Sequence, residues 1–143
     1  MQGINRMYLI AFPLLLIPFA LFNMIVFLLD LPLTDTVATV PLMSRRMLPL
    51  TSGELLVAAG ILLLYLEVLK AARLGGKGVM DHLLSLLLFA AMAAELALVA
   101  RAATPALLLL AVLGFVDMII GISVPARRRP REIAIEGPDH APV

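Results

Sequence analysis

The sequence predicts an all-α, polytopic membrane protein, an antiparallel bundle of four transmembrane helices with both termini in the cytoplasm. Hydrophobic residues make up 62% of the 143 residues and charged residues only 15%. Soluble domains are about 45–50% apolar and about 25% charged, and so short a chain cannot bury this excess in one globule. The four long apolar stretches set the number of spans, and the distribution of arginine and lysine between the connections sets their orientation.

The composition also excludes several classes of protein. The chain has no cysteine, which excludes disulfides, thiol catalysis and metal sites built on thiolates. Its formal net charge is +1, so the total charge gives no sign of nucleic-acid binding. The sequence contains no nucleotide-binding phosphate loop, no H-E-x-x-H and no G-x-S-x-G. We therefore expect no enzyme activity, no cofactor, no metal site, and neither a nucleotide nor a nucleic acid as partner.

The first predicted span covers residues 7–29, which carry no charge and lie between Arg6 and Asp30. At 1.5 Å per residue a helix of this length measures about 34 Å, enough to cross a hydrocarbon core of about 30 Å. Pro13 and Pro18 fall inside the span and are expected to kink it. The carbonyls that a kink frees need partners, so we expect this helix to pack against other helices.

Helix-start signals define the next two spans. The second span covers residues 54–73, and Thr51 and Glu54 have the spacing of a capping box at its start. The third span covers residues 81–100, with Asp81 as the predicted N-cap at the positive end of the helix dipole.

The fourth span covers residues 105–124 and begins at Pro105, because proline is tolerated at the first helical position. The connections on either side of the third span are short, which predicts that the second, third and fourth helices are antiparallel neighbours. Residues 1–124 therefore form one transmembrane domain, and the charged, proline-rich residues 125–143 are predicted to be a disordered basic tail.

Basic residues are distributed unevenly between the two sides of the predicted bundle. Eight lie on the side of the termini, namely Arg6, Lys70, Arg73, Lys77, Arg127, Arg128, Arg129 and Arg131. Three lie on the other side, namely Arg45, Arg46 and Arg101. The positive-inside rule therefore places both termini in the cytoplasm, and an even number of spans agrees with this. We expect a multi-pass membrane protein.

The extracytoplasmic connection at residues 31–53 is apolar and rich in proline. We expect it either to cover the helix ends as an apolar lid or to lie along the membrane surface. In the second arrangement Arg45 and Arg46 contact anionic lipid headgroups. The same kind of contact is expected for the tail, through Arg127, Arg128, Arg129 and Arg131.

Several short motifs resemble a known group of proteins. They are Pro41-Leu42-Met43-Ser44, Gly53-Glu54-Leu55-Leu56, Glu67-Val68-Leu69-Lys70, Arg73, Gly75, Asp81-His82 and Leu84-Ser85. With them the sequence resembles small four-helix inner-membrane proteins of proteobacteria that carry no known activity. The resemblance spans most of residues 8–124 and implies an inner-membrane location and four spans. It implies no substrate and no catalytic residue.

Three acidic residues lie within the predicted spans, away from their ends: Glu67, Glu95 and Asp117. A charge in a membrane-spanning helix costs about 2.5–3.5 kcal/mol on insertion scales, so each acid needs a physical reason. Glu67 precedes Lys70 by three residues, the favourable order for an ion pair near the cytoplasmic interface. Glu95 and Asp117 either join helices through hydrogen bonds or belong to a proton or cation path, in which Tyr65 and Ser85 are candidate bridging hydroxyls.

Small residues and one polar stripe predict which helix faces pack closely. The predicted packing residues are Gly60 on the Glu67 face, Gly114 and Gly121 on the Asp117 face, and Ala90, Ala93, Ala94 and Ala97 on the third helix. A second face of the third helix carries Asp81, Ser85, Leu88, Met92 and Glu95. This stripe is expected to face the bundle interior, because lipid disfavours its polar groups.

Two functions remain compatible with the sequence. The first is a non-catalytic integral membrane protein, an accessory, assembly or scaffold subunit that contacts other membrane subunits or a second copy through its helices. The second is a small proton- or cation-coupled transporter or channel that uses Glu67, Glu95 and Asp117. The missing catalytic motifs and the lack of a sizeable soluble domain favour the first. In both, the lipid bilayer is a partner.

Overall fold

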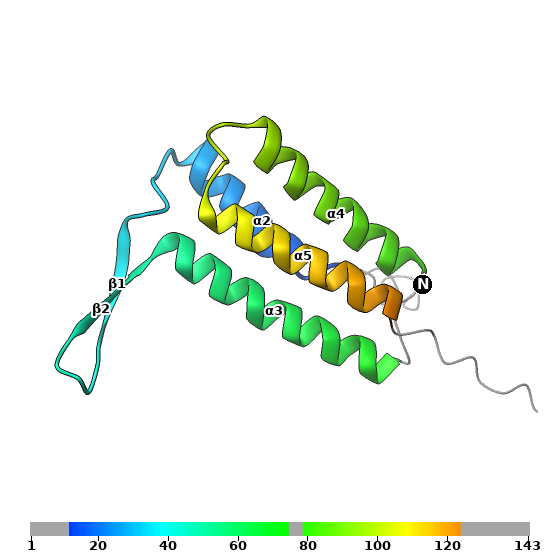
Figure 1. Ribbon diagram of the computed structural model, residues 1–143, viewed down its shortest axis with the longest axis horizontal. Coiled ribbons are helices and arrows are strands. Elements are labelled where there is room, and N and C mark those ends of the chain that lie inside the picture. Colours follow the sequence, from blue (N-terminus) through cyan, green and yellow to red (C-terminus); the bar gives the residue numbers. More distant parts are fainter. Residues whose placement is uncertain (1–11, 75–78, 124–143) are drawn as a thin grey trace, which may run out of the picture.

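The computed structural model describes residues 12–74 and 79–123, which form helices and one small β-hairpin. The elements follow in the order α2 (Leu16–Asn23), the π-helix η1 (Met24–Leu28), β1 (Thr36–Pro41), β2 (Met47–Thr51), α3 (Ser52–Leu74), α4 (Val79–Leu98) and α5 (Pro105–Ser123). Successive helices run in opposite directions (Figure 1). The hairpin therefore lies at the same end of the bundle as the α4–α5 connection, and the start of α2 lies at the end where α5 finishes.

The predicted fold class is confirmed in its mainly helical character but is wrong in being all-α. Residues 36–51 form a two-stranded antiparallel sheet in which Val40 pairs with Leu48 and Pro41 with Met47. The prolines in this segment do not prevent pairing, because each strand of a two-stranded sheet has a free edge on which a missing donor is tolerated.

Residues 42–46 join the two strands, and the hydrogen bond between Leu42 and Arg46 encloses a three-residue loop, residues 43–45. The Arg45 amide donates to the Leu42 carbonyl at 3.0 Å, and the Leu42 amide donates to the Arg46 carbonyl at 2.9 Å. Arg45 has a φ of 61°, in the left-handed region. A turn followed by one left-handed residue is a standard way to close such a loop. The local chain geometry, rather than burial, therefore holds the two strands together, since every residue of β1 is exposed.

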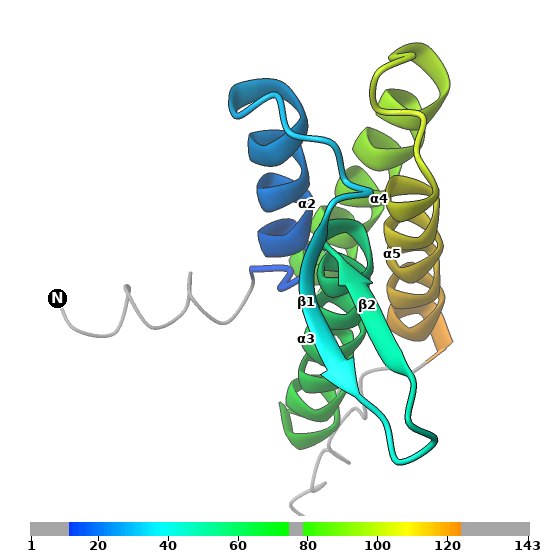
Figure 2. The ribbon, with the colours of Figure 1, turned by 90° about the vertical axis from the view of Figure 1, so that its left-hand side faces the viewer.

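At the helix ends, Leu33 of the connection is buried in the core, whereas the hairpin that follows it is almost entirely exposed. The hairpin runs across the direction of the helices and extends sideways past the first turns of α3 (Figures 1 and 2). Its base is tied to α3, because the Ser52 amide donates to the Asp35 carbonyl at 3.2 Å and the Gly53 amide to the Leu33 carbonyl at 3.0 Å. A Cβ on Gly53 would lie 3.2 Å from that same Leu33 oxygen, so the close approach favours glycine.

The helix starts differ from the prediction at α2 and α4, whereas α3 has the predicted capping box and α5 begins at the predicted proline. Pro13 precedes α2 and Pro18 lies in its first turn, where a missing amide donor needs no partner, so neither proline acts as the predicted kink. The start of α4 at Val79 places Asp81 in the first turn rather than at the N-cap. In α5 the Leu107 amide donates to Thr104 Oγ1 at 3.3 Å, capping a helix that begins at the predicted proline.

The capping box of α3 is confirmed by two reciprocal hydrogen bonds. The Thr51 amide donates to Glu54 Oε2 at 2.8 Å, and the Glu54 amide donates to Thr51 Oγ1 at 3.2 Å. Both bonds satisfy groups that an uncapped helix start leaves unpaired. The observed helix, Ser52–Leu74, therefore starts two residues before the predicted span.

The core of the bundle is centred on α5. This helix lies between α3 and α4 and also packs against α2 (Figure 1). Leu107 and Leu110 are almost fully buried on it, and they meet Phe22 of α2 and Met92 of α4 in the same core. The prediction that the second and third helices are neighbours is wrong, because α5 occupies the space between α3 and α4.

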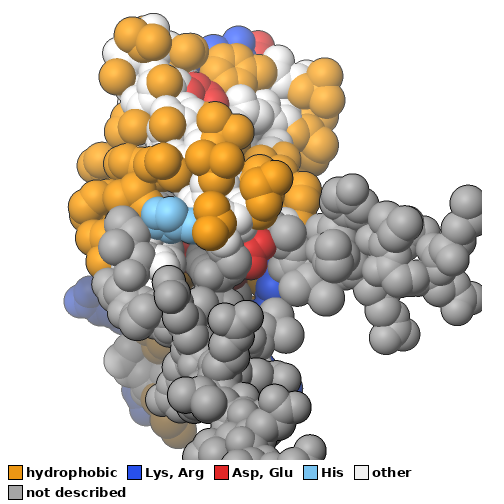
Figure 3. All heavy atoms as spheres, turned by 90° about the vertical axis from the view of Figure 1, so that its right-hand side faces the viewer, with side chains coloured by type: hydrophobic (Ala, Val, Ile, Leu, Met, Phe, Trp, Pro, Cys, Tyr) orange, Lys and Arg blue, Asp and Glu red, His pale blue; other side chains and the backbone are white. Residues whose placement is uncertain are grey.

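The outward faces of the helices are covered by large apolar side chains. Leu62 of α3 is 65% exposed, Leu87 of α4 is 65% exposed and Leu108 of α5 is 51% exposed. Figure 3 shows hydrophobic side chains spread over the outer surface, with few charges among them. This distribution is the reverse of that on a soluble helical bundle, where charged residues face outward.

Two helices, Ser52–Arg73 and Val79–Leu98, are long and apolar enough to cross a membrane by length and composition. Within the described residues two more apolar helices, Leu16–Leu28 and Pro105–Gly121, are shorter. The N-terminal part of the first predicted span, residues 75–78 and the predicted basic tail with its four arginines lie outside the described residues.

Candidate functional site

Polar side chains inside the bundle are the candidate functional groups. Among the described residues the buried polar or charged side chains are Glu67, Ser85 and Asp117, which are 4%, 2% and 1% exposed. Each comes from a different helix: α3, α4 and α5. Ionisable groups inside an apolar bundle mark either a structural join or a functional site.

The packing of the helices places these three residues at one level. Gly60 of α3 faces Leu110 of α5, since a Cβ on Gly60 would lie 3.0 Å from Leu110 Cδ2. Glu67 and Asp117 follow seven residues later on these two parallel helices. Seven residues are close to two turns, so both acids return to the faces that meet at Gly60 and Leu110.

The contact between α4 and α5 places Ser85 at the same level. A Cβ on Gly114 would lie 2.5 Å from Met92 Cε and 3.7 Å from Phe89 Cα, so Gly114 packs closely on α4. From this contact Asp117 lies about one turn further along α5, and Ser85 about one turn back along the antiparallel α4. We call Glu67, Ser85 and Asp117 the acidic layer.

Glu67 is anchored by the start of α2. The Leu14 amide donates to Glu67 Oε2 at 3.1 Å. Leu14 lies just before Leu15, the N-cap residue of α2, and a carboxylate is favourable near the positive end of a helix. Glu67 is buried, so its carboxylate lies inside the bundle, and the predicted Glu67–Lys70 ion pair stays a prediction.

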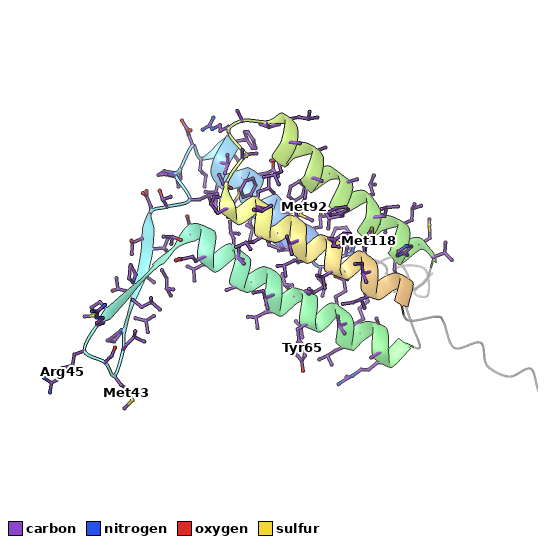
Figure 4. All side chains as sticks on the ribbon, in the orientation of Figure 1. Met43, Arg45, Tyr65, Met92 and Met118 are labelled. Carbon is purple, nitrogen blue, oxygen red and sulfur yellow. The ribbon has the colours of Figure 1, made fainter. Side chains whose placement is uncertain are left out.

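Tyr65 does not belong to the acidic layer. Its side chain is 61% exposed and points away from the bundle on the outer face of α3 (Figure 4). Two residues correspond to about 200° around a helix, which puts Tyr65 nearly opposite Glu67. The predicted role of Tyr65 as a bridging hydroxyl is therefore wrong, whereas Ser85 is buried on the interior stripe of α4.

A second, partly buried polar contact lies nearer the hairpin end. Asn23 Nδ2 donates to Glu95 Oε2 at 3.2 Å and to the Phe19 carbonyl at 3.1 Å. Glu95 Oε1 is buried and has no hydrogen-bond partner among the described residues. The sequence analysis predicts no role for Asn23, although an amide in an apolar run is itself a signal of a polar contact between helices. The π-helix η1 begins directly after Asn23.

Apolar side chains separate the acidic layer from the Asn23–Glu95 pair. Because Asp117 lies level with Ser85, Glu95, ten residues further along α4, is almost three turns, or about 15 Å, from Asp117 along the bundle. Leu88 and Met92 lie between Ser85 and Glu95 on the same face of α4 and are both buried. The described interior thus contains two separate polar contacts rather than a continuous chain of acids.

Beyond Glu95, at the hairpin end, the structure shows a contact that the sequence did not predict. Arg101 forms a salt bridge with Asp30, and its guanidinium lies 5.8 Å from the centre of the Phe27 ring. Asp30 adopts a φ of 55°, which turns the chain sharply after η1. The pair joins the end of the first helical segment to the α4–α5 connection.

The alanine face of α4 is turned outward rather than into the bundle. Ala90, Ala94 and Ala97 are exposed and Ala93 is half-buried. Gly60 and Gly114, by contrast, are used for contacts within the chain, and Gly121 is half-buried near the end of α5. The bundle therefore leaves one small-residue surface on its outside, which we call the alanine face (Ala90, Ala94 and Ala97).

The two arginines of the hairpin are both exposed. Arg45 and Met43 lie at the tip and point away from the helices, whereas Met92 and Met118 lie toward neighbouring helices (Figure 4). Within the described segments, no group of three histidine, cysteine, aspartate or glutamate side chains is arranged to hold a metal ion. No protein-family model, no curated protein and no solved structure matches this chain.

Proposed function

We propose that this chain is a four-span protein of a bacterial inner membrane with both termini in the cytoplasm, and that it acts as a non-catalytic accessory, assembly or scaffold subunit. It contacts other membrane subunits or a second copy through its helices. The apolar outer surface supports the membrane location. Lipid can cover the exposed leucines of α3, α4 and α5 without leaving a polar group unpaired, because the backbone groups of a helix are bonded within it.

The observation that carries the proposed helix contacts is the alanine face. Small residues let two helix backbones approach closely, and membrane helices associate through such faces because lipid provides no hydrophobic drive. None of the other described helices packs against the alanine face, as its three alanines are exposed. A helix from another subunit can therefore approach α4 closely along Ala90, Ala94 and Ala97.

Site-directed cross-linking tests this contact directly. The chain has no cysteine, so one introduced cysteine is a unique attachment point. Ala94→Cys carries a short thiol-linked photo-cross-linker on the alanine face. Leu62→Cys, on the exposed face of α3, is the matched control. We expect a discrete cross-linked product in native membranes from Ala94→Cys and not from Leu62→Cys.

The mass of the product identifies the partner class. Twice the mass of the chain indicates a second copy, and any other discrete mass indicates a different subunit. Ala90→Leu in the Ala94→Cys background should abolish the product, because bulk on the face prevents close approach. Equal products from both positions, or none from Ala94→Cys, would contradict a contact at the alanine face.

The acidic layer favours a second candidate, a small proton- or cation-coupled transporter. Two carboxyl groups buried at one level are the kind of group that such proteins use. The apolar side chains between this layer and Glu95 argue against a transporter, because an ion path across the bundle needs polar groups or water along its whole length. We therefore place this function second.

Asp117 distinguishes the two functions. Asparagine has nearly the shape of aspartate but cannot carry a proton or a charge. If Asp117 joins helices, Asp117→Asn should leave assembly intact, with stability changed by about 1 kcal/mol, whereas Asp117→Leu should impair assembly. A wild-type proton or cation flux well above that of empty liposomes, lost in a well-folded Asp117→Asn variant, would instead establish the transporter.

A further inference from the structure

A groove of about 720 Å³ opens on the side of the bundle at the hairpin end. Its walls are apolar and come from two helices, with Val57, Ala58 and Ile61 on α3 and Ala106 and Leu109 on α5. The connection at residues 31–34 closes it at the helix ends. Its volume lies within the range of about 300–1,000 Å³ that is usual for pockets that bind small molecules.

The polar residues of the groove gather at one end. Arg101 and Glu54 line it there, together with hydroxyl groups such as that of Thr104. All three lie at or near the ends of their helices, whereas Ile61 and Leu109 lie further along α3 and α5. The groove therefore changes from charged to apolar along the helix direction, as a lipid does from its headgroup to its acyl chain.

Both charged groups are held in place by contacts that leave hydrogen-bonding capacity free. Arg101 is fixed by Asp30 and by the ring of Phe27, but a guanidinium has five N–H donors and the side chain is half exposed. Glu54 receives the Thr51 amide on Oε2, and the residue is otherwise exposed. A cation and an anion thus face the same opening in fixed positions.

We propose that this groove binds one phospholipid with a zwitterionic ethanolamine headgroup. One acyl chain lies along Ala58 and Leu109, the phosphate accepts hydrogen bonds from Arg101, and the primary ammonium donates to Glu54. Arginine suits phosphate because its planar N–H groups match the phosphate oxygens. The proposal rests on the proposed membrane location of the chain, because the lipid enters from the bilayer leaflet at the hairpin end.

Native mass spectrometry of the full-length protein in mild detergent tests the site. The probes are phosphatidylethanolamine and phosphatidylglycerol with identical acyl chains. We expect one bound phosphatidylethanolamine and about a tenfold preference for it over phosphatidylglycerol, the size expected from one charge-assisted hydrogen bond. Ala58→Phe fills the groove and should abolish the adduct. Ala72→Phe, on the same face of α3 four turns along, should retain it.

Three further variants test the headgroup contacts separately. Arg101→Gln should lose both lipids, whereas Asp30→Asn, which breaks the same salt bridge but keeps the arginine, should retain phosphatidylethanolamine. Glu54→Gln keeps the capping box, since glutamine can also serve in it, but it removes the charge that attracts the ammonium. This variant should bind both lipids equally.

Adducts without headgroup preference in the wild type, or an Ala58→Phe protein that retains the lipid, would overturn the proposal. So would a Glu54→Gln protein that keeps the full preference. A different result would contradict the proposed membrane location, namely release of the wild-type protein from membranes at alkaline pH. A protein that stays in the membrane but binds no lipid therefore contradicts the groove alone.

Discussion

At the scale of single residues, the described interior is organised by polar contacts between different helices. The Asn23 side chain donates to Glu95, and the backbone amide of Leu14, just before α2, donates to Glu67. A buried hydrogen bond contributes modestly, but losing one partner leaves the other group unsatisfied. The two contacts therefore tie α2 to α4 and α3 more through the penalty of breaking them than through their own strength.

Asn23→Leu should lower the free energy of unfolding by about 1–2 kcal/mol, because Glu95 Oε2 loses its donor. The double variant Asn23→Leu with Glu95→Leu should recover most of this loss, since no buried carboxyl group then remains unpaired. Unfolding in mixed micelles measures both. A double variant no more stable than Asn23→Leu would show that the hydrogen bond is not the source of the effect.

Gly114 provides a second test at this scale. A Cβ there would lie 2.5 Å from Met92 Cε, the flexible end of a buried side chain. Gly114→Ala should therefore change stability little, because the methionine methyl can move and alanine favours helix. Gly114→Leu should cost about 1–3 kcal/mol through overpacking.

Met92→Ala should relieve that cost by making room for the leucine. A double-mutant cycle of the two positions should give a coupling energy of about 1 kcal/mol or more. Strictly additive free energies would mean that Gly114 and Met92 do not share the contact between α4 and α5.

At the scale of elements, the hairpin is the part of the structure least supported by burial. A two-stranded hairpin is marginally stable in water, and its strands here are almost entirely exposed. Its stability depends on the loop and on two hydrogen bonds at its base. In these bonds the Ser52 amide donates to the Asp35 carbonyl and the Gly53 amide to the Leu33 carbonyl. If the helices span a membrane, the hairpin lies along the membrane surface, where headgroups or a partner can cover its apolar residues.

Arg45→Gly should stabilise the hairpin by about 1 kcal/mol, because the left-handed conformation at this position strains any residue with a Cβ. Slower hydrogen exchange of the Leu42 amide, which bonds to the Arg46 carbonyl, reports the change. Arg46→Gly removes the same charge at a position without a positive φ and should not slow exchange. Equal effects of the two variants would point to charge instead of backbone strain.

At the scale of the whole molecule, the arrangement depends on α5 lying between the other helices. Connection lengths predict the directions of the helices, and these directions agree with the structure (Figure 1). They do not predict contacts, since α3 and α4 follow each other in the chain but both pack on α5. This arrangement brings Glu67 and Asp117, fifty residues apart, to one level.

The topology of the whole chain can be tested with reporter fusions. A reporter at the C-terminus should be active in the cytoplasm, because the basic residues favour that side. A reporter inserted at Met43, which is fully exposed at the hairpin tip, should behave as extracytoplasmic. If the C-terminal reporter is extracytoplasmic and the reporter at Met43 is cytoplasmic, the orientation is the reverse of the one proposed. If both reporters are cytoplasmic, the chain does not cross the membrane between Met43 and the C-terminus as proposed.

The sequence alone determined the features that depend on neighbours three or four residues away. The capping box at Thr51 and Glu54, the helix start at Pro105 and the mainly helical fold follow from such local patterns. Only the tertiary structure decided the central place of α5, the outward turn of Tyr65 and the partner of Glu67. The physical reason is that helix neighbours are chosen by the fit of whole faces, such as Gly60 against Leu110, which no local pattern contains.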